Sequence, residues 1–166
     1  MHTIITVLEL CLRWNEPRRS VYIGMQRLMC KGKIHKATVT EADLNYMGSI
    51  TIDSILLKAA DITPYEIVQI TNFRNAARWK TYAIPGEQGS GKICLNGPPA
   101  HLFEPGDTVV ILSMGHYSEE EVAKLAPRVV FVDQQNRIVR VEDHPLYDEK
   151  GDIDWDGLQI KQMDQT

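Results

Sequence analysis

Apolar and polar residues alternate in short runs through the middle of the chain, and residues that favour turns separate these runs. Alternation with a period of two residues predicts β-strands that bury one face. On the first predicted strand this rule places Lys33, His35, Ala37 and Val39 on one face. The predicted strands are residues 28–39, 66–71, 78–84, 92–95, 108–113, 128–132 and 137–141.

Residues that favour helix N-termini predict a few short helical segments between these strands. They are a turn capped by Thr40 with Asp43, a helix over residues 54–60 capped by Asp53, and a helix over residues 119–125 capped by Ser118 with Glu121. Many short strands with few short helices predict a mainly β fold, either a small β-barrel or a sandwich.

The 166 residues are enough for one domain with a substantial core, and 43% of them are hydrophobic. We expect residues 1–24 to be an N-terminal extension outside the core, because Glu9 interrupts their apolar run and no basic region precedes it. That run is also too short to span a bilayer, so no membrane association is expected. Residues 25–142 then form the core domain, and residues 143–166 form an acidic, partly disordered tail.

Charge and cysteine content exclude several classes of function. The tail holds seven acidic residues and two lysines, and neither it nor the remainder forms a basic stripe, so no nucleic acid partner is expected. The three cysteines, Cys11, Cys30 and Cys94, are odd in number and widely spaced, which fits reduced thiols in a cytoplasm. Cys30 and His35 lack the clustered partners of a zinc site, so no metal is expected.

The dipeptide Gly48-Ser49 is the strongest candidate for chemistry. A serine hydroxyl held against the preceding carbonyl can attack it and replace the amide with an ester. β-Elimination then cuts the chain and leaves dehydroalanine, which hydrolyses to a pyruvoyl ketone. Glycine suits position 48 because it tolerates the strained backbone that the attack needs. The dipeptide alone does not establish this chemistry.

The sequence on either side of Gly48-Ser49 strengthens this candidate. Four motifs lie in order along the chain: residues 25–49, then Arg-Trp-Lys-Thr-Tyr-Ala-Ile at 78–84, Asn-Gly-Pro-Pro-Ala-His at 96–101, and Gly-Asp at 106–107. In this order and spacing they closely resemble the pyruvoyl-dependent aspartate 1-decarboxylases. The resemblance implies a double-psi β-barrel and a homotetramer with active sites near subunit contacts.

The same resemblance implies a precursor that cleaves itself between Gly48 and Ser49, with or without a maturation factor. The matured lyase would convert L-aspartate to β-alanine and CO2 for cytoplasmic pantothenate and coenzyme A biosynthesis. Ser49 would become the pyruvoyl group, which forms a Schiff base with the substrate amine and acts as an electron sink. Tyr82 would donate a proton to the decarboxylated intermediate, and Thr81 would contact substrate and assist cleavage near the Gly48 carbonyl.

A dicarboxylate substrate also needs fixed positive charge. Arg78 can grip a carboxylate with two parallel hydrogen bonds, and Lys33, with His35 beside it on the same face, offers a second charge from another strand. Strict alternation puts Arg78 and Tyr82 on one face and Thr81 on the other. Thr81 or Tyr82 would then serve a neighbouring subunit's site, or the strand would be distorted.

The resemblance identifies Asn96, Gly97, Pro98 and Pro99 as the substrate-binding loop. Pro98 and Pro99 depart from the family, in which small residues such as alanine are usual, and proline has no N–H to donate to a ligand. Gly97 and the Asn96 side chain keep their expected contacts.

Two further motifs imitate binding sites. Residues 86–92 fit most of a phosphate-binding pattern, but Ile93 follows where Ser or Thr should hold magnesium, so a glycine-rich hairpin is expected, with its Gly89-Ser90 bond left intact. Residues 152–157 resemble the start of a calcium loop, but Met163 stands where the closing glutamate belongs. We instead expect this part of the tail to dock Trp155 and Leu158 on the barrel.

One alternative stays open at the level of sequence. A chain that keeps the fold but is never processed would be a small β-barrel binding or assembly module, because it would lack the electron sink that decarboxylation needs.

Overall fold

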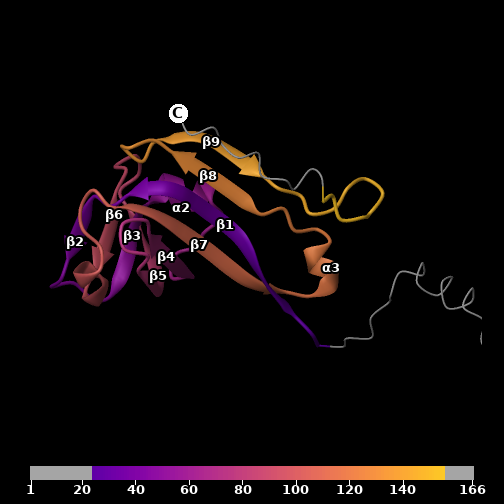
Figure 1. The fold of residues 1–166 in the computed structure, drawn as a ribbon, viewed down its shortest axis with the longest axis horizontal. Helices are drawn as coiled ribbons and strands as arrows, with labels where there is room; N and C mark the ends of the chain where they lie inside the picture. Colours follow the sequence, from indigo (N-terminus) through magenta and orange to yellow (C-terminus); the bar gives the residue numbers. More distant parts are fainter. Residues whose placement is uncertain (1–23, 156–166) are drawn as a thin grey trace, which may run out of the picture.

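Nine β-strands form one hydrogen-bonded sheet in residues 24–155, the part of the chain that the computed structural model describes (Figure 1). Their order in the sheet is β2-β6-β3-β5-β4-β7-β1-β8-β9. The strands are β1 (Arg27–Thr38), β2 (Glu41–Asp43), β3 (Ser49–Asp53), β4 (Ile67–Asn72), β5 (Arg78–Gly86), β6 (Ile93–Asn96), β7 (Thr108–Tyr117), β8 (Arg128–Val132) and β9 (Ile138–Asp143). The mainly β prediction is confirmed.

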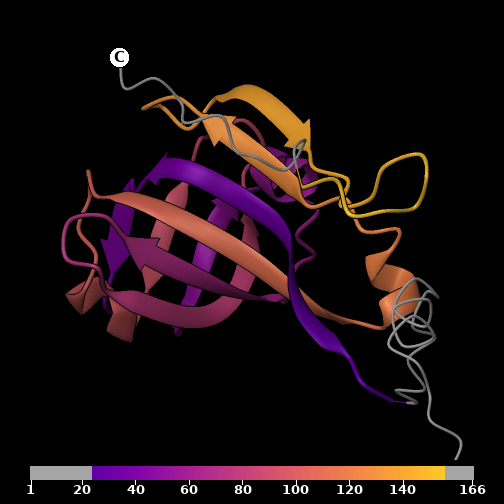
Figure 2. The same ribbon diagram turned by 45° about the vertical axis from the view of Figure 1, so that its right-hand side comes forward.

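The sheet curls into a barrel because the chain beyond β1 returns to β6 (Figure 2). The backbone N–H of Thr40 donates to the carbonyl of Ile93 over 2.8 Å. The Thr40 hydroxyl also donates to that carbonyl and accepts from the Ile93 N–H, each over 3.0 Å. This closure and the strand order are consistent with the double-psi β-barrel that the family resemblance implies.

One apolar core fills the barrel. Alternate residues of the longer barrel strands, such as β4 and β7, point inward, as the period of two predicts, and burying them supplies the main stabilisation of the fold. The fully buried side chains are Ile34, Ala37, Ile50, Ile52, Ala60, Val68, Ile70, Ala83, Ile93, Leu95, Phe103, Val109, Ile111 and Val130.

The predicted face of β1 is wrong beyond His35. A bulge interrupts the strand, with Lys36 at a φ of 58° and a register shift between Ile34 and Ala37. Both Ile34 and Ala37 are therefore buried in the core, whereas Lys33 and His35 remain half-buried on the outer face. A strict period of two cannot anticipate a bulge, because the extra residue reverses the side-chain direction.

The helical turn predicted at Thr40 and Asp43 is also wrong. These residues flank and end β2, which pairs in parallel with β6. The Thr40 hydroxyl bonds both backbone groups of Ile93 and does not cap a helix. The Asp43 carboxylate accepts the N–H of Asn45 at the start of the next turn.

The two longer helical predictions are confirmed in shorter form. Helix α2 (Ser54–Ala59) begins at Asp53, whose side chain accepts the Ile55 N–H. Helix α3 (Glu119–Val122) has the predicted capping box of Ser118 with Glu121. A 3-10 helix, η1 (Pro98–His101), follows β6 and was not predicted. No helix within residues 24–155 is long and apolar enough to cross a membrane.

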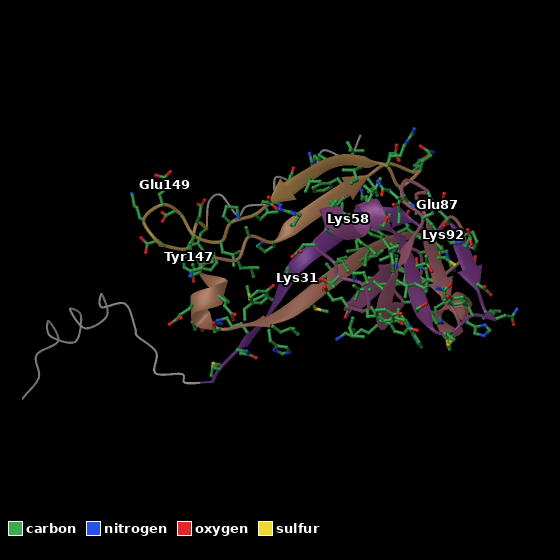
Figure 3. All side chains as sticks on the ribbon, turned by 180° about the vertical axis from the view of Figure 1, so that it is seen from behind. Lys31, Lys58, Glu87, Lys92, Tyr147 and Glu149 are labelled. Carbon is green, nitrogen blue, oxygen red and sulfur yellow. The ribbon has the colours of Figure 1, made fainter. Side chains whose placement is uncertain are left out.

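The glycine-rich loop is not the hairpin that its sequence predicted, because β3 lies between β5 and β6. Asp53 explains the loop's conformation. Its carboxylate accepts the N–H of Gly89 over 3.0 Å and the N–H of Gly91 over 2.7 Å. An internal carboxylate thus takes the amides that a phosphate would need, at the end of the barrel where Glu87 and Lys92 lie (Figure 3).

The tail returns toward the first strand as far as the structure describes it. Tyr147 pairs with Ile153 in an isolated bridge, and this loop lies near α3 (Figure 3). Trp155 keeps 74% of its surface exposed. The predictions for residues 1–23, which include Cys11, and for Leu158 lie outside the described residues.

Candidate active site

Ser49 begins β3 and is completely buried. Its hydroxyl donates to the carbonyl of Met47 over 3.3 Å and accepts an N–H from the Asn96 side chain over 2.9 Å. The two residues lie opposite each other because β3 and β6 pair antiparallel, with Ser49 beside Asn96. The serine oxygen is thus held in one place, with its proton directed away from Asn96.

The Asn96 amide is itself fully occupied. Its Nδ2 also donates to the hydroxyl of Thr51 over 2.9 Å, and its Oδ1 accepts from the thiol of Cys94 over 3.1 Å. All of these side chains share the face of β3 and β6 that points away from the core, because Ile50 and Leu95 occupy the inner face. Three polar partners therefore fix the amide next to Ser49.

Gly97 packs directly against the peptide that contains Gly48. Its φ of 76° and ψ of −141° suit glycine. A Cβ at Gly97 would lie 2.9 Å from the carbonyl oxygen of Tyr46 and 3.0 Å from both the nitrogen and the Cα of Gly48. The Gly97 N–H donates to the carbonyl of Asp43 over 2.6 Å. Only glycine lets the loop after β6 approach the predicted cleavage bond this closely.

Tyr82 lies next to Ser49 across the pairing of β3 with β5. The strands run parallel with Ile50 opposite Ala83, and both of those residues point into the core. The residues just before them, Ser49 and Tyr82, therefore share the outer face. Tyr82 is half-buried, and its ring stacks on Tyr65 at 5.7 Å between centroids.

Arg78 lies four residues before Tyr82 on the same face of β5 and is exposed. Four residues of strand separate their Cα atoms by about 13 Å. The two side chains therefore extend from well-separated positions on one face of β5.

Thr81 lies on the inner side of β5, between Arg78 and Ala83 in sequence, and is only 9% exposed. It pairs with Val68 on β4. The alternation that separates Thr81 from Tyr82 is regular here, and no register shift interrupts β5 against β4. The structure therefore places the two adjacent residues on opposite faces.

Lys33 and His35 are not brought to Ser49 along the sheet, because β4 and β7 separate β1 from β5. His35 packs edge-on against Phe131, with ring centroids 5.4 Å apart, and its Nδ1 is buried without a hydrogen-bond partner among the described residues. Burial and then the nearby charges of Lys33, Lys36 and Arg140 lower the pKa of His35. The imidazole is thus neutral at pH 7.

Pro98 and Pro99 begin η1, where proline is suited to the first helical positions because the N–H there has no partner within the helix. Pro98 is exposed and Pro99 is buried. Pro98 is the nearer of the two prolines to the cleavage bond. A Cβ added to Gly48 would lie 3.6 Å from Pro98 Cδ. These prolines stiffen the loop beside Ser49.

The Gly106-Asp107 motif lies in the loop before β7, where Asp107 holds the loop in place. The Asp107 carboxylate accepts from Arg74 Nε over 2.6 Å, from Asn72 over 2.6 Å and from the Glu104 N–H over 2.9 Å. The Arg74 guanidinium is the main reason that the pKa of Asp107 falls to about 2. This clamp joins the end of β4 to the loop before β7.

Sequence reasoning missed Cys94 and Thr51, the two residues that share the Asn96 amide with Ser49. Each lies two positions from a predicted site residue, so the period of two already put it on the right face. The sequence does not show the antiparallel register of β3 against β6. That register brings Ser49 and Thr51 next to Asn96 and Cys94.

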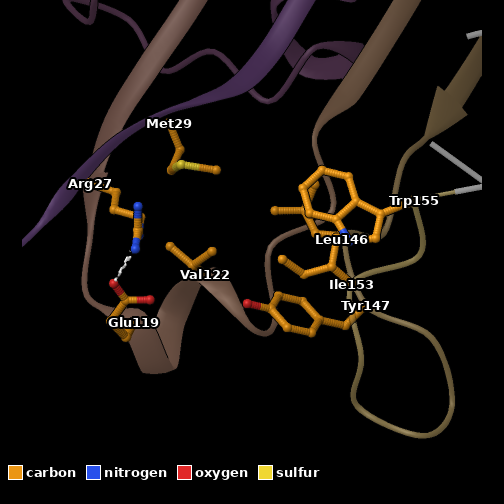
Figure 4. A pocket seen from close by; sticks show the side chains of 8 residues that line it. All are labelled: Arg27, Met29, Glu119, Val122, Leu146, Tyr147, Ile153 and Trp155. Atoms are coloured by element: carbon orange, nitrogen blue, oxygen red, sulfur yellow. Dashed lines mark hydrogen bonds and ion pairs between the residues drawn. The ribbon is translucent and has the colours of Figure 1, made fainter. Parts of the chain in front are cut away.

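A groove elsewhere on the molecule contains none of the predicted site residues. It has a volume of about 330 Å³ and lies between the start of β1, α3 and the tail (Figure 4). The ion pair of Arg27 with Glu119 crosses one end of it over 2.8 Å. Its lining residues are Arg27, Met29, Glu119, Val122, Leu146, Tyr147, Ile153 and Trp155.

Comparison with known proteins identifies the family of this chain. Residues 25–139 match the aspartate decarboxylase family. The chain is 54% identical over 115 residues to the aspartate 1-decarboxylase of Heliobacterium modesticaldum, covering 69% of this chain and 87% of that one. It is 53% identical over 118 residues to the enzyme of the same name from Moorella thermoacetica, covering 71% and 92%. The corresponding protein of Thermoanaerobacter pseudethanolicus is 52% identical over 117 residues, covering 70% and 100%. This chain therefore belongs to the aspartate decarboxylase family.

Proposed function

We propose that this chain is the precursor of a pyruvoyl-dependent lyase that converts L-aspartate to β-alanine and CO2. The observation that carries the proposal is the buried Ser49 hydroxyl, which Asn96 holds next to Gly48 in a chain of this family. We further propose that the product serves cytoplasmic synthesis of pantothenate and coenzyme A.

The surroundings of Ser49 fit the formation of a pyruvoyl group from it. The hydroxyl proton is directed at the Met47 carbonyl and one lone pair takes the Asn96 N–H, which leaves a second lone pair on the oxygen for attack. Gly48 presents no side chain on the approach to its carbonyl. The neighbouring Gly97 keeps the peptide confined.

Self-cleavage then needs two steps. The Ser49 oxygen adds to the Gly48 carbonyl carbon, and the C–N bond breaks as its nitrogen takes a proton, which gives an ester. Loss of the Cα proton of residue 49 and of the Gly48 carboxylate cuts the chain and leaves dehydroalanine, which water converts to the ketone with release of ammonia. The products are a β fragment ending at Gly48 and an α fragment beginning at residue 49.

The pyruvoyl group would supply the electron sink that decarboxylation of an α-amino acid needs. The chain's own residues would bind the substrate and move the proton. Arg78 grips a carboxylate in a bidentate manner, and the Tyr82 hydroxyl delivers a proton to the α-carbon after CO2 leaves. Both lie on the face of the barrel that carries Ser49.

Lys33 and His35 join this site from a neighbouring copy in a homotetramer. The strand order supports this assignment, because two strands separate β1 from β5 within one chain. Lys33 then supplies the second positive charge for the dicarboxylate, and Asn96 and the loop from Gly97 to Pro99 close over the substrate. For Thr81, whose side chain lies on the inner face, we propose that any contact with substrate or with the Gly48 carbonyl uses its backbone.

An assay with L-aspartate labelled at its α-carboxyl carbon tests the proposal. The wild-type protein should release the label as CO2 and form β-alanine, and Ser49→Ala should fold but neither cleave nor release CO2. Ser90→Ala is the matched control, since Ser90 also follows a glycine but its hydroxyl is exposed and donates to Glu87. Product formation by Ser49→Ala, or a wild-type chain that stays whole and inactive, would favour the unprocessed binding module.

A further inference from the structure

Three side chains surround the Asn96 amide, and one of them is the buried thiol of Cys94, which has no binding or proton-transfer role in the proposed reaction. We propose that Cys94 is a positioning residue for self-cleavage, whose S–H fixes the orientation of the Asn96 amide so that its N–H points at the oxygen of Ser49. This inference rests on the proposed cleavage between Gly48 and Ser49.

The Cys94 thiol, the Asn96 amide and the Ser49 hydroxyl contact one another in that order. Cys94 and Asn96 lie two residues apart on β6 and share its outer face, and Cys94 Sγ lies 3.1 Å from Asn96 Oδ1. On the other side of the amide, Nδ2 lies 2.9 Å from Ser49 Oγ. Cys94 is 2% exposed, Asn96 is 3% exposed and Ser49 is fully buried, so water does not compete for these contacts.

The thiol decides which way the amide faces. In the reversed orientation, Oδ1 would face the hydroxyls of Ser49 and Thr51, and the NH2 group would face sulfur, which is a weak acceptor. At least one buried N–H would then lack a good partner, at a cost comparable with a lost hydrogen bond. In the observed orientation both N–H groups reach hydroxyl oxygens, and Oδ1 receives the thiol proton.

The thiol can act as a donor only while it is protonated. Burial is the main cause that raises the pKa of Cys94, and the nearby Glu41 carboxylate adds to it. The S–H group therefore persists at neutral pH. The same burial makes the thiol a poor nucleophile, so its part in cleavage is confined to positioning.

The orientation matters at both steps of cleavage. Before the first step the amide N–H holds the Ser49 oxygen in place while the serine proton is free to leave. In the second step the Cα proton of residue 49 passes to solvent, its electron pair forms the Cα=Cβ bond, and the Cβ–Oγ electrons leave on the Gly48 carboxylate. An N–H aimed at that oxygen stabilises the charge that develops on it.

The test follows freshly translated chains by intact mass at successive times. Cys94→Ala removes the donor, and Cys94→Ser restores one of similar size. We expect Cys94→Ala to cleave about tenfold more slowly, the effect of losing one buried hydrogen bond, and Cys94→Ser to cleave within about twofold of wild type. Hydroxylamine cuts esters, so the fraction of uncleaved chain that it cuts shows which of the two steps the substitution slows.

Cys30→Ala is the matched control, because Cys30 lies on β1 and its thiol faces the Gly32 carbonyl. Its cleavage rate should equal that of wild type. Melting temperatures measured in a Ser49→Ala background show whether each cysteine variant folds. If Cys94→Ala does not fold, Cys94→Val removes the donor while filling the space of the thiol, and its cleavage rate is judged by the same criterion.

Equal cleavage rates in wild type and the donor-free variant would overturn the role of Cys94 while leaving the proposed function intact. A Cys94→Ser chain as slow as Cys94→Ala would overturn it too, since packing would then be the cause. Failure of the wild-type chain to cleave would instead overturn the proposed function and this inference with it.

Discussion

Two Gly-Ser bonds in this chain differ in what surrounds their serine hydroxyls. Ser49 is fully buried, and its oxygen accepts from Asn96. Ser90 lies in the exposed loop before β6, and its hydroxyl donates to the Glu87 carbonyl three residues earlier. The local sequence Gly-Ser is the same, so the difference comes entirely from the strand pairing that buries one serine beside an amide.

At the scale of single residues, Tyr82→Phe separates maturation from turnover. The variant should cleave normally, because Tyr82 makes no contact with the Ser49 hydroxyl, whose partners are Met47 and Asn96. Its turnover should fall at least a hundredfold, the usual loss when a general acid is removed. Cleavage is read by intact mass and turnover by β-alanine release.

Tyr65→Phe is the control for Tyr82→Phe, since Tyr65 stacks on the Tyr82 ring but is largely exposed. It should keep most of its turnover. Unchanged turnover in Tyr82→Phe would remove the proton-donor role.

At the scale of elements, the loop from β6 into η1 sets the distance between Gly97 and the predicted cleavage bond at Gly48-Ser49. Gly97→Ala forces a Cβ to within 3.0 Å of the Gly48 backbone, so the chain around the cleavage bond must shift. We expect cleavage to slow at least tenfold, because a misplaced reacting group loses rate steeply. Time courses of intact mass measure this change.

The control for that substitution is Gly106→Ala. Gly106 also has a positive φ, of 93°, but a Cβ there would meet nothing within 4 Å. It should lose stability through backbone strain, yet cleave at the wild-type rate. Equal slowing in both variants would mean that strain alone, and not contact with Gly48, explains the effect.

The Asp107 clamp gives the fold an acid sensitivity. Its pKa of about 2 lies below the ordinary carboxyl value, so it stabilises the folded state fully above about pH 5 and loses that effect as pH falls toward 2. Asp107→Asn should lower the free energy of unfolding by about 2 kcal/mol at pH 7, and by about half as much at pH 3, because the carboxyl group is then only partly protonated in the folded state. Urea titrations at both pH values measure the difference.

Asp133→Asn is the comparison for Asp107→Asn, because Asp133 pairs with the exposed Arg137. Asp133→Asn should lower the free energy of unfolding at pH 7 much less than Asp107→Asn does, because water screens an exposed ion pair. A loss in Asp107→Asn that stays constant from pH 7 to pH 3 would contradict the clamp.

The strands and capped helices could be predicted from sequence because alternation and caps are local signals. The faces near Lys36 could not, since a bulge depends on how β1 meets β7 and not on β1 alone. The glycine-rich loop was misread for the same reason: Asp53, which organises it, lies over thirty residues earlier in the chain. Within the site, motifs pointed to Ser49 and Asn96, whereas Cys94 required the pairing register.

At the scale of the whole molecule, the strand order separates two groups of predicted site residues. Ser49, Tyr82 and Arg78 share β3 and β5, whereas Lys33 and His35 lie on β1. If sites form between copies, Lys33→Ala and Tyr82→Phe should each be nearly inactive alone, yet regain activity when coexpressed. Random mixing in a closed oligomer restores both groups in about a quarter of the sites.

Mixing the two purified variants after assembly is the control for coexpression, since stable oligomers do not exchange subunits. It should restore little activity. Coexpressed chains that stay as inactive as either parent would place Lys33 in the same copy's site or outside the site.

The most direct test of the central claim is an intact-mass spectrum of the purified, incubated protein under denaturing conditions. We predict two fragments that meet between Gly48 and residue 49, the larger carrying the mass of a pyruvoyl group in place of serine. A single chain with the full mass of all 166 residues would contradict self-cleavage and the lyase that depends on it.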